Sequence, residues 1–253
     1  MPGGRSEMKY FLSKTVLPVV TRLAQERTLC AFDFDGTLSP IAEHPDQAGM
    51  RDRTRSLLNS LASLYPCIIV SGRARADVLE KLGDVKVDRV IGNHGAETEA
   101  TQTFRQRMDQ WKAALEVEVG FIPGVWVEDK GLSLAIHYRQ ASSKMEARKR
   151  IAAATQRLES ARVYGGKQVV NVVQEGLPNK GDALADERDR LGCGGVMYVG
   201  DDENDEDAFA MEGNIVAVRI RRSLHSRAGY FLRSQVEVDE LLDLLVQMRE
   251  AVA

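Results

Sequence analysis

The chain has 253 residues, of which 43% are hydrophobic and 28% are charged, a composition typical of globular proteins. Its net charge of −3 at pH 7 gives no general attraction to nucleic acid or to anionic membranes. No apolar run approaches the roughly 18 residues that a membrane-spanning helix needs, and the N-terminal residues lack the pattern of a secretory signal. We therefore expect a cytoplasmic enzyme or binding domain that engages neither nucleic acid nor membrane; the oligomeric state stays open.

The cysteines Cys30, Cys67 and Cys193 are widely spaced and odd in number, and two of them lie in apolar, strand-like runs. This pattern is typical of small core residues in a reduced protein. It argues against a disulfide framework or a zinc site.

Up to residue 97, helix-period segments alternate with short apolar runs, a pattern typical of parallel α/β sheets. The apolar spacing predicts a helix over 12–23, a strand over 28–34, a helix over 57–65, a strand over 67–70, a short helix over 77–82 and a strand over 89–92.

Between residues 104 and 175 the pattern changes to helix, hairpin, helix, hairpin, which indicates an α+β unit. The expected elements are a helix over 104–118, strands over 125–128 and 132–139 around the turn at 129–131, a helix over 143–160, and strands over 161–164 and 167–173.

Alternation resumes at Lys180, with helices over 180–191, 207–211 and 236–249 and strands over 196–200 and 215–218. The simplest interpretation is a Rossmann-like parallel-sheet core with helices on both faces. We expect this core to comprise residues 1–103 and 176–253, with residues 104–175 forming an inserted α+β cap domain.

Asp33 and Asp35 stand where the apolar run over 28–34 ends, within the sequence Asp-Phe-Asp-Gly-Thr-Leu. Ligands of open α/β sheets bind at the carboxyl ends of strands, and residues two apart in a strand point to the same side. Two carboxylates this close repel each other unless a cation lies between them, and oxygen ligands suit Mg²⁺. The alternative is an Asp-Gly turn whose aspartates are only solvated.

Three other segments also follow strands or open helices. Ser71-Gly72-Arg73 offers a hydroxyl and backbone N–H groups to an anion, although Ser71 could equally cap a helix. Residues 201–207 include six acidic side chains in seven, which would complete a metal shell or form a solvated loop. Lys180 opens a helix whose N–H groups favour an anion, although a lone lysine is more commonly a surface residue.

In this order, the four features resemble the motifs of the haloacid dehalogenase superfamily of phosphotransferases, and the resemblance covers the whole core. It implies that Asp33 is a nucleophile that forms an aspartyl-phosphate, and that Asp35 is the general acid and base. Ser71 and Lys180 would bind the transferring phosphoryl group. The implied cofactor is Mg²⁺, with candidate ligands Asp33, Asp35 through its backbone carbonyl, Asp201, and Asp202 and Asp205 nearby or through water.

Further segments resemble the trehalose-6-phosphate phosphatase branch: Asn93-His94-Gly95-Ala96-Glu97, Val127-Glu128-Asp129-Lys130, His137-Tyr138-Arg139, Asn179-Lys180-Gly181 and Asp205-Glu206-Asp207. The chain departs from that branch at Asn171-Val172-Val173-Gln174, where a Glu and a Pro are usual, and at Asn204, where Thr is usual. The branch implies a small-molecule sugar phosphate, trehalose 6-phosphate, as the substrate. The candidate substrate-binding residues are Ser71, Gly72, Arg73, Asn93, His94, Gly95, Glu128, Lys130 and Lys180.

Several alternatives stay open at this stage. His94 could bond only the backbone, and Glu128 with Lys130 could form an exposed ion pair. We expect His137 to be packed or at the surface. Functional alternatives are a phosphatase of another sugar phosphate, such as a glycosyl-phosphoglycerate or sucrose phosphate, a phosphomutase, or a non-catalytic sensor of a phosphorylated ligand.

Overall fold

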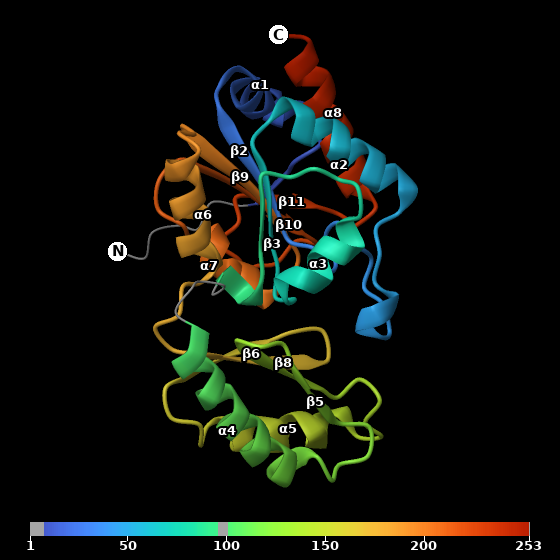
Figure 1. Ribbon diagram of the computed structural model, residues 1–253. Coiled ribbons are helices and arrows are strands. Elements are labelled where there is room, and N and C mark those ends of the chain that lie inside the picture. The colour runs from blue at the N-terminus through green and yellow to red at the C-terminus, as the bar shows by residue number, and fades with distance from the viewer. Residues whose placement is uncertain (1–7, 96–100, 253) are drawn as a thin grey trace, which may run out of the picture.

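The computed structural model of the chain describes residues 8–95 and 101–252. Ala96 and Glu97, part of the resemblance noted above, lie outside the described residues. The chain forms a larger unit around one sheet and a smaller unit with its own sheet, which lies below it in Figure 1. No helix in the described part of the chain has the length and apolar character needed to cross a membrane.

The larger unit contains a seven-stranded sheet in the order β1-β11-β10-β9-β2-β3-β4, and every pairing is parallel. Its strands are β1 (Lys9–Tyr10), β2 (Thr28–Phe32), β3 (Cys67–Val70), β4 (Arg89–Ile91), β9 (Gly195–Gly200), β10 (Ile215–Ile220) and β11 (Tyr230–Leu232). The strands β2, β3 and β9 are buried along their whole length, because helices cover both faces of the sheet.

The helices divide between the two faces of this sheet (Figure 1). On one face lie α1 (Leu17–Gln25), α2 (Asp52–Leu64), α3 (Arg75–Leu82) and α8 (Glu237–Glu250), and on the other lie α6 (Lys180–Arg190) and α7 (Glu206–Phe209). Within β2, Cys30 and Phe32 pack on the first face, whereas Leu29 and Ala31 pack on the second.

The smaller unit is an antiparallel sheet in the order β5-β6-β8-β7, with two helices on one of its faces. Its elements are α4 (Thr101–Val119), β5 (Trp126–Asp129), β6 (Ser133–His137), α5 (Lys144–Thr155), β7 (Ala161–Gly165) and β8 (Val169–Gln174). The sheet and both helices share one apolar core. The opposite face of the sheet is turned toward the larger unit (Figure 1).

These elements confirm the predicted fold class, a parallel-sheet core with helices on both faces and an inserted α+β cap. The short strands β1 and β11 were not predicted, because two or three residues carry too little apolar pattern. The first α-helix begins at Leu17 rather than at residue 12, with Pro18 in its first turn, where proline is tolerated. The helix predicted over 143–160 ends at Thr155.

Candidate active site

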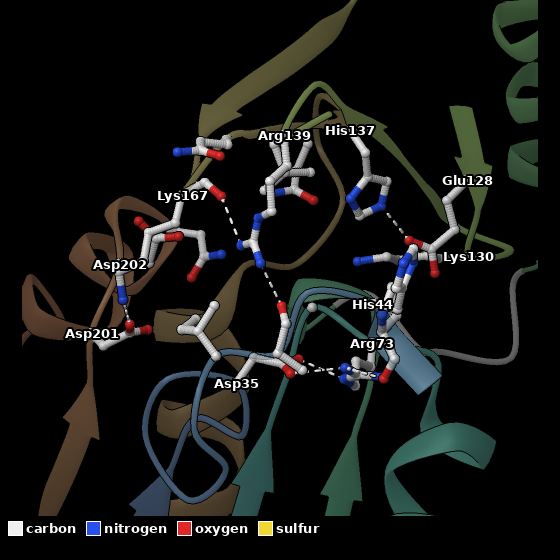
Figure 2. A pocket seen from close by; sticks show the side chains of 18 of the residues that line it. Asp35, His44, Arg73, Glu128, Lys130, His137, Arg139, Lys167, Asp201 and Asp202 are labelled. Carbon is white, nitrogen blue, oxygen red and sulfur yellow. Dashed lines mark hydrogen bonds and ion pairs between the residues drawn. The ribbon is translucent and has the colours of Figure 1, made fainter. Parts of the chain in front are cut away.

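Asp33 stands at the centre of the core, directly after β2. Its backbone N–H donates to the carbonyl oxygen of Val199 in the neighbouring strand at 2.9 Å. The side chain is buried, with 6% of the residue exposed, and it faces a cavity between the core and the cap. Figure 2 shows that both units contribute side chains to this cavity.

Lys180 joins two of the carboxylates at this edge of the sheet. Its Nζ donates to Asp33 Oδ1 at 2.8 Å and to Asp205 Oδ1 at 2.6 Å. The other oxygen of Asp205 accepts from the backbone N–H groups of Asp201 at 2.8 Å and Asp202 at 2.9 Å. Asp205 therefore fixes the start of the acidic run, and Lys180 ties that run to Asp33.

Asp33, Asp201 and Asp205 carry carboxylate oxygens that lie within 4.8 Å of one another. One oxygen of Asp201, Oδ1, is buried and has no hydrogen-bond partner. Hard oxygen donors of this kind suit Mg²⁺, so the three carboxylates fit a divalent cation. Gly36, at a φ of 82°, leaves the room for Asp201, since a Cβ there would lie 2.1 Å from Asp201 Oδ2.

The electrostatics of the cluster favour an added cation. Burial raises the pKa of Asp33 well above its usual range, and the charges of Asp205 and Asp201 raise it further against the opposing charge of Lys180. Burial also raises the pKa of Asp201 to about 7, although Lys167 opposes the shift. For Asp205 the balance is reversed: burial raises its pKa, but the ion pair with Lys180 outweighs burial and holds the pKa below its usual value.

Asp35 lies in a different environment, paired with Arg73 (Figure 2). The guanidinium donates to both oxygens of Asp35, at 2.5 Å from Nε and 2.8 Å from an Nη, and also to Asp77 at 2.5 Å and to the carbonyl of Pro45 at 2.9 Å. A bidentate pair of this kind fixes the carboxylate in direction as well as in place. Arg73, which the sequence suggested as a substrate-binding residue, thus orients Asp35.

His94 is buried in a strained turn after β4, the 3₁₀ segment Asn93–Gly95. The φ angles of Asn93 and His94 are 51° and 59°, a region that non-glycine residues seldom adopt and that often marks a functional site. Both ring nitrogens lack a hydrogen-bond partner, and the ring stacks on Tyr164 of the cap at 5.8 Å. Burial, aided by the charges of Lys180 and Lys130, lowers the pKa of His94 well below its usual value, so the ring is neutral.

The cap presents Trp126, Glu128 and Lys130 to the cavity. These residues alternate along β5 and its turn, and so share one face. His137 of β6 lies across from them, and its Nε2 is 2.7 Å from Glu128 Oε2 (Figure 2). The ring of His137 also stacks on Trp126 at 4.6 Å. Burial raises the pKa of Glu128, but the hydrogen bond to His137 and the charge of Lys130 outweigh burial and lower it. His137 is thus packed, as expected, and it also lines the cavity.

The structure separates the residues suggested by the sequence into two groups. Those that line the cavity are Asp33, Asp35, Gly72, Arg73, His94, Glu128, Lys130, Asp201 and Asp202. Those that lie behind its wall are Ser71, Asn93, Gly95, Lys180 and Asp205. Asp202 is not one of the three clustered carboxylates; it caps the next turn, accepting from the N–H of Glu203 at 2.9 Å.

Several lining residues were missed by the sequence reasoning. Arg139 donates to the carbonyl of Ala42 at 2.5 Å, and Lys167 forms an ion pair with Asp201. Asn171 of β8 also lines the cavity. A usable signal existed for Arg139, because it stands two residues after His137 in the predicted strand and so falls on the same face. Lys167 gave no such signal, because it lies in the turn before β8, next to Gln168 at a φ of 66°.

The sequence of the chain is similar to those of known proteins. Residues 31–235 match the family model described as trehalose-phosphatase. A trehalose-phosphate phosphatase of Mycobacterium tuberculosis is 34% identical over 244 residues, covering 87% of this chain and 62% of the relative, so the chain spans about three fifths of that protein. A probable trehalose-phosphate phosphatase 2 of Oryza sativa is 29% identical over 272 residues, covering 91% of this chain and 71% of the relative.

Solved structures share the fold. The C-terminal domain of the trehalose-6-phosphate phosphatase of C. albicans superposes with a TM-score of 0.81 at 20% identity, covering 96% of this chain and 99% of that one. A trehalose-6-phosphate phosphatase related protein gives 0.72 at 22% identity, covering 89% of this chain and all of that one. The matched range runs from the strand before Asp33 through the cap to the acidic run and beyond, and the chain belongs to the trehalose-phosphatase family.

Proposed function

We propose that this chain hydrolyses trehalose 6-phosphate to trehalose and phosphate through an aspartyl-phosphate on Asp33. The observation that carries the proposal is the position of the Asp33 carboxylate. It is bonded to Lys180, clustered with Asp201 and Asp205, and open to a cavity that the cap closes from the other side.

Each chain residue has a defined task in this reaction. Asp33 attacks phosphorus, and Lys180 keeps its carboxylate in place while the charge moves onto the phosphoryl oxygens. Asp35, oriented by Arg73, gives a proton to the leaving sugar oxygen and then takes one from the water that cleaves the acyl-phosphate. The backbone of Gly72, which lines the cavity, completes the phosphoryl contacts, and Ser71 supports this loop from behind by accepting from the N–H of Arg73 at 3.2 Å.

Mg²⁺ is the proposed cofactor. Asp33, Asp201 and Asp205, with Asp202 and the backbone carbonyl of Asp35 nearby, would hold it, and it would neutralise charge on the transferring group. Removing divalent cations with EDTA should lower the melting temperature, and Mg²⁺ should restore it, because binding relieves the repulsion among buried carboxylates. Asp201→Asn should lose most of that thermal response, which is a readout independent of turnover.

The cap supplies the proposed substrate specificity. Glu128 and Lys130 face the cavity from β5 and its turn in the cap, whereas Asp33 faces it from the core. They would contact sugar hydroxyls, together with His94 at the core edge.

We place the domain boundaries at residues 104 and 175, with core segments 1–103 and 176–253. The three buried, unpaired cysteines support a reducing, cytoplasmic location.

A phosphate-release panel tests the substrate assignment. Purified protein with Mg²⁺ would be offered trehalose 6-phosphate, sucrose 6-phosphate, a glucosyl-phosphoglycerate, glucose 6-phosphate and p-nitrophenyl phosphate. The proposal expects the highest kcat/KM for trehalose 6-phosphate. The other sugar phosphates belong in the panel because Asn171, a neutral residue, lines the cavity at the departure from the branch. A higher kcat/KM for one of them would overturn the assignment, and binding without release would identify a sensor.

A further inference from the structure

The acidic run over 201–207 contributes Asp201 and Asp205 to the carboxylate cluster. The same run also contacts the β7–β8 hairpin of the cap. Both oxygens of Asp207 accept from β7. Arg162 donates to Oδ1, and the hydroxyl of Tyr164 donates to Oδ2 at 2.8 Å. Asp207 lies in α7 of the core, and it is not among the residues that line the cavity.

The hairpin continues along the acidic run in the opposite chain direction. A Cβ on Gly165 would lie 2.4 Å from Glu203 Oε2, and one on Gly166 would lie 3.0 Å from Asp202 Oδ2. The hairpin therefore approaches the loop as closely as its two glycines allow. The next residue, Lys167, forms its ion pair with Asp201 (Figure 2).

Tyr164 connects this contact to the active-site edge of the core. Its hydroxyl is held by Asp207 while its ring stacks on His94, with the rings inclined by 22°. One cap residue thus touches two core segments, the turn after β4 and α7 at the end of the acidic run. A shift of β7 would therefore change both the stacking of Tyr164 on His94 and the distance between Lys167 and Asp201.

We propose that Asp207 is a positioning residue, which fixes the β7–β8 hairpin to the core and so sets the position of the cap over Asp33. The proposal rests on the proposed function, because a cap that reads a sugar must hold Glu128 and Lys130 at a set place relative to the reacting phosphate. Asp207 acts through Arg162 and Tyr164, and touches no reacting atom.

The chain provides a matched control one residue away. Glu206 is 25% exposed at its side chain and Asp207 24%, and both stand in α7. Among the described residues, Glu206 pairs with core groups: it accepts from Arg219 at 2.8 Å and from the backbone N–H of Arg227 at 2.8 Å. Glu206→Gln and Asp207→Asn therefore remove the same charge from the same helix, but only the second loosens the cap.

The test compares wild type, Asp207→Asn, Tyr164→Phe and Glu206→Gln. Asp207→Asn should lower kcat/KM for trehalose 6-phosphate by about 5- to 30-fold, since a charged hydrogen-bond pair is lost from a partly buried site. With p-nitrophenyl phosphate, which has no sugar to read, the loss should stay within about twofold. Glu206→Gln should stay within about twofold on both substrates, although its melting temperature falls.

Hydrogen exchange supplies a second readout that does not depend on turnover. Amides over residues 161–174 should exchange faster in Asp207→Asn, and to a smaller extent in Tyr164→Phe, but at the wild-type rate in Glu206→Gln. The effects of Asp207→Asn and Tyr164→Phe should be less than additive in the double variant, because each removes the same contact. Equal behaviour of Asp207→Asn and Glu206→Gln in exchange and in substrate ratio would overturn the proposal. If wild type itself releases no phosphate from trehalose 6-phosphate, the proposed function fails, and the exchange comparison still decides whether Asp207 holds the hairpin.

Discussion

The imidazole of His94 fills the space that a side chain at position 72 would need: a Cβ on Gly72 would lie 2.5 Å from His94 Cε1. The loop after β3 and the turn after β4 are thereby fitted against each other. Gly95 makes a similar approach to the start of α6, where its Cβ would lie 2.4 Å from the carbonyl oxygen of Asn179. Through these two contacts, the segments that carry Ser71, His94 and Lys180 form one rigid edge.

Gly72→Ala should disturb this edge. The added methyl group must displace His94 or the backbone, which we expect to destabilise the fold by about 1–3 kcal/mol and to lower phosphatase activity. His94→Ala in the same chain removes the clash, so Gly72→Ala/His94→Ala should be more stable than the sum of the two single losses predicts. Urea unfolding of the four proteins gives the coupling energy. Strictly additive losses would show that the ring and position 72 do not compete for space.

Asp33→Asn should separate chemistry from stability. An amide has nearly the same shape but is a poor nucleophile, so phosphate release should fall at least about 1,000-fold. In EDTA the melting temperature should stay constant or rise, because burial and neighbouring carboxylates already disfavour the charged form of Asp33. Phosphate release and calorimetry on one preparation test both parts. Residual activity above a few per cent would contradict a covalent mechanism on Asp33.

Lys180→Met is the contrasting variant. It removes the cation that Asp33 and Asp205 share and leaves both buried carboxylates without their partner. Loss of one member of a buried ion pair costs about 3–5 kcal/mol. The two variants should therefore shift the melting temperature in different ways although both are inactive.

The core half of the site could be predicted from sequence because of where its residues stand. Asp33, Ser71 and Asp201 each directly follow an apolar run, and the carboxyl ends of parallel strands meet at one edge of a sheet. The pattern could not show that the Arg73 guanidinium binds Asp35 and Asp77. This pairing depends on side-chain rotamers within the folded loop.

The cap residues of the site were harder to predict from sequence, for a physical reason. Alternation predicts that Trp126, Glu128 and Lys130 share a face, but which face turns toward the core is decided by packing of α4 and α5 on the other one. The contacts of Lys167 with Asp201 and of Tyr164 with Asp207 join residues 34 and 43 positions apart. They arise only when two separately folded sheets meet, and no local spacing encodes them.

Glu128 should make the stability depend on acid pH. Its hydrogen bond to His137 and the charge of Lys130 hold its pKa below the ordinary value, despite burial. A carboxyl with a lowered pKa in the folded state contributes stability that is present above its ordinary pKa of 4.5 and is lost as the pH falls through the folded value. Wild type should exceed Glu128→Gln by about 0.5–1 kcal/mol at pH 7. Urea unfolding at pH 7, 5 and 4 should show this difference shrink with acid, and a constant difference would exclude ionisation of Glu128 as its source.

Lys130→Ala tests whether the cap reads the sugar. If Lys130 contacts hydroxyls remote from phosphorus, its binding energy helps to orient the reacting atoms. The variant should then lose about 10- to 1,000-fold in kcat/KM for trehalose 6-phosphate while p-nitrophenyl phosphate hydrolysis barely changes. The ratio of the two activities is the measurement, because it cancels errors in the concentration of active enzyme.

Arg105→Ala is the control for this prediction, since Arg105 pairs with Asp129 beside the same turn at 3.0 Å and does not line the cavity. Its loss should cost about 0–1 kcal/mol of stability and leave the activity ratio unchanged, as for any exposed ion pair. Equal losses of Lys130→Ala on both substrates would indicate damaged folding of the cap. No loss on either would remove Lys130 from substrate recognition, and the sugar would then have to be read by Glu128, His94 or Asn171, each of which faces the same cavity.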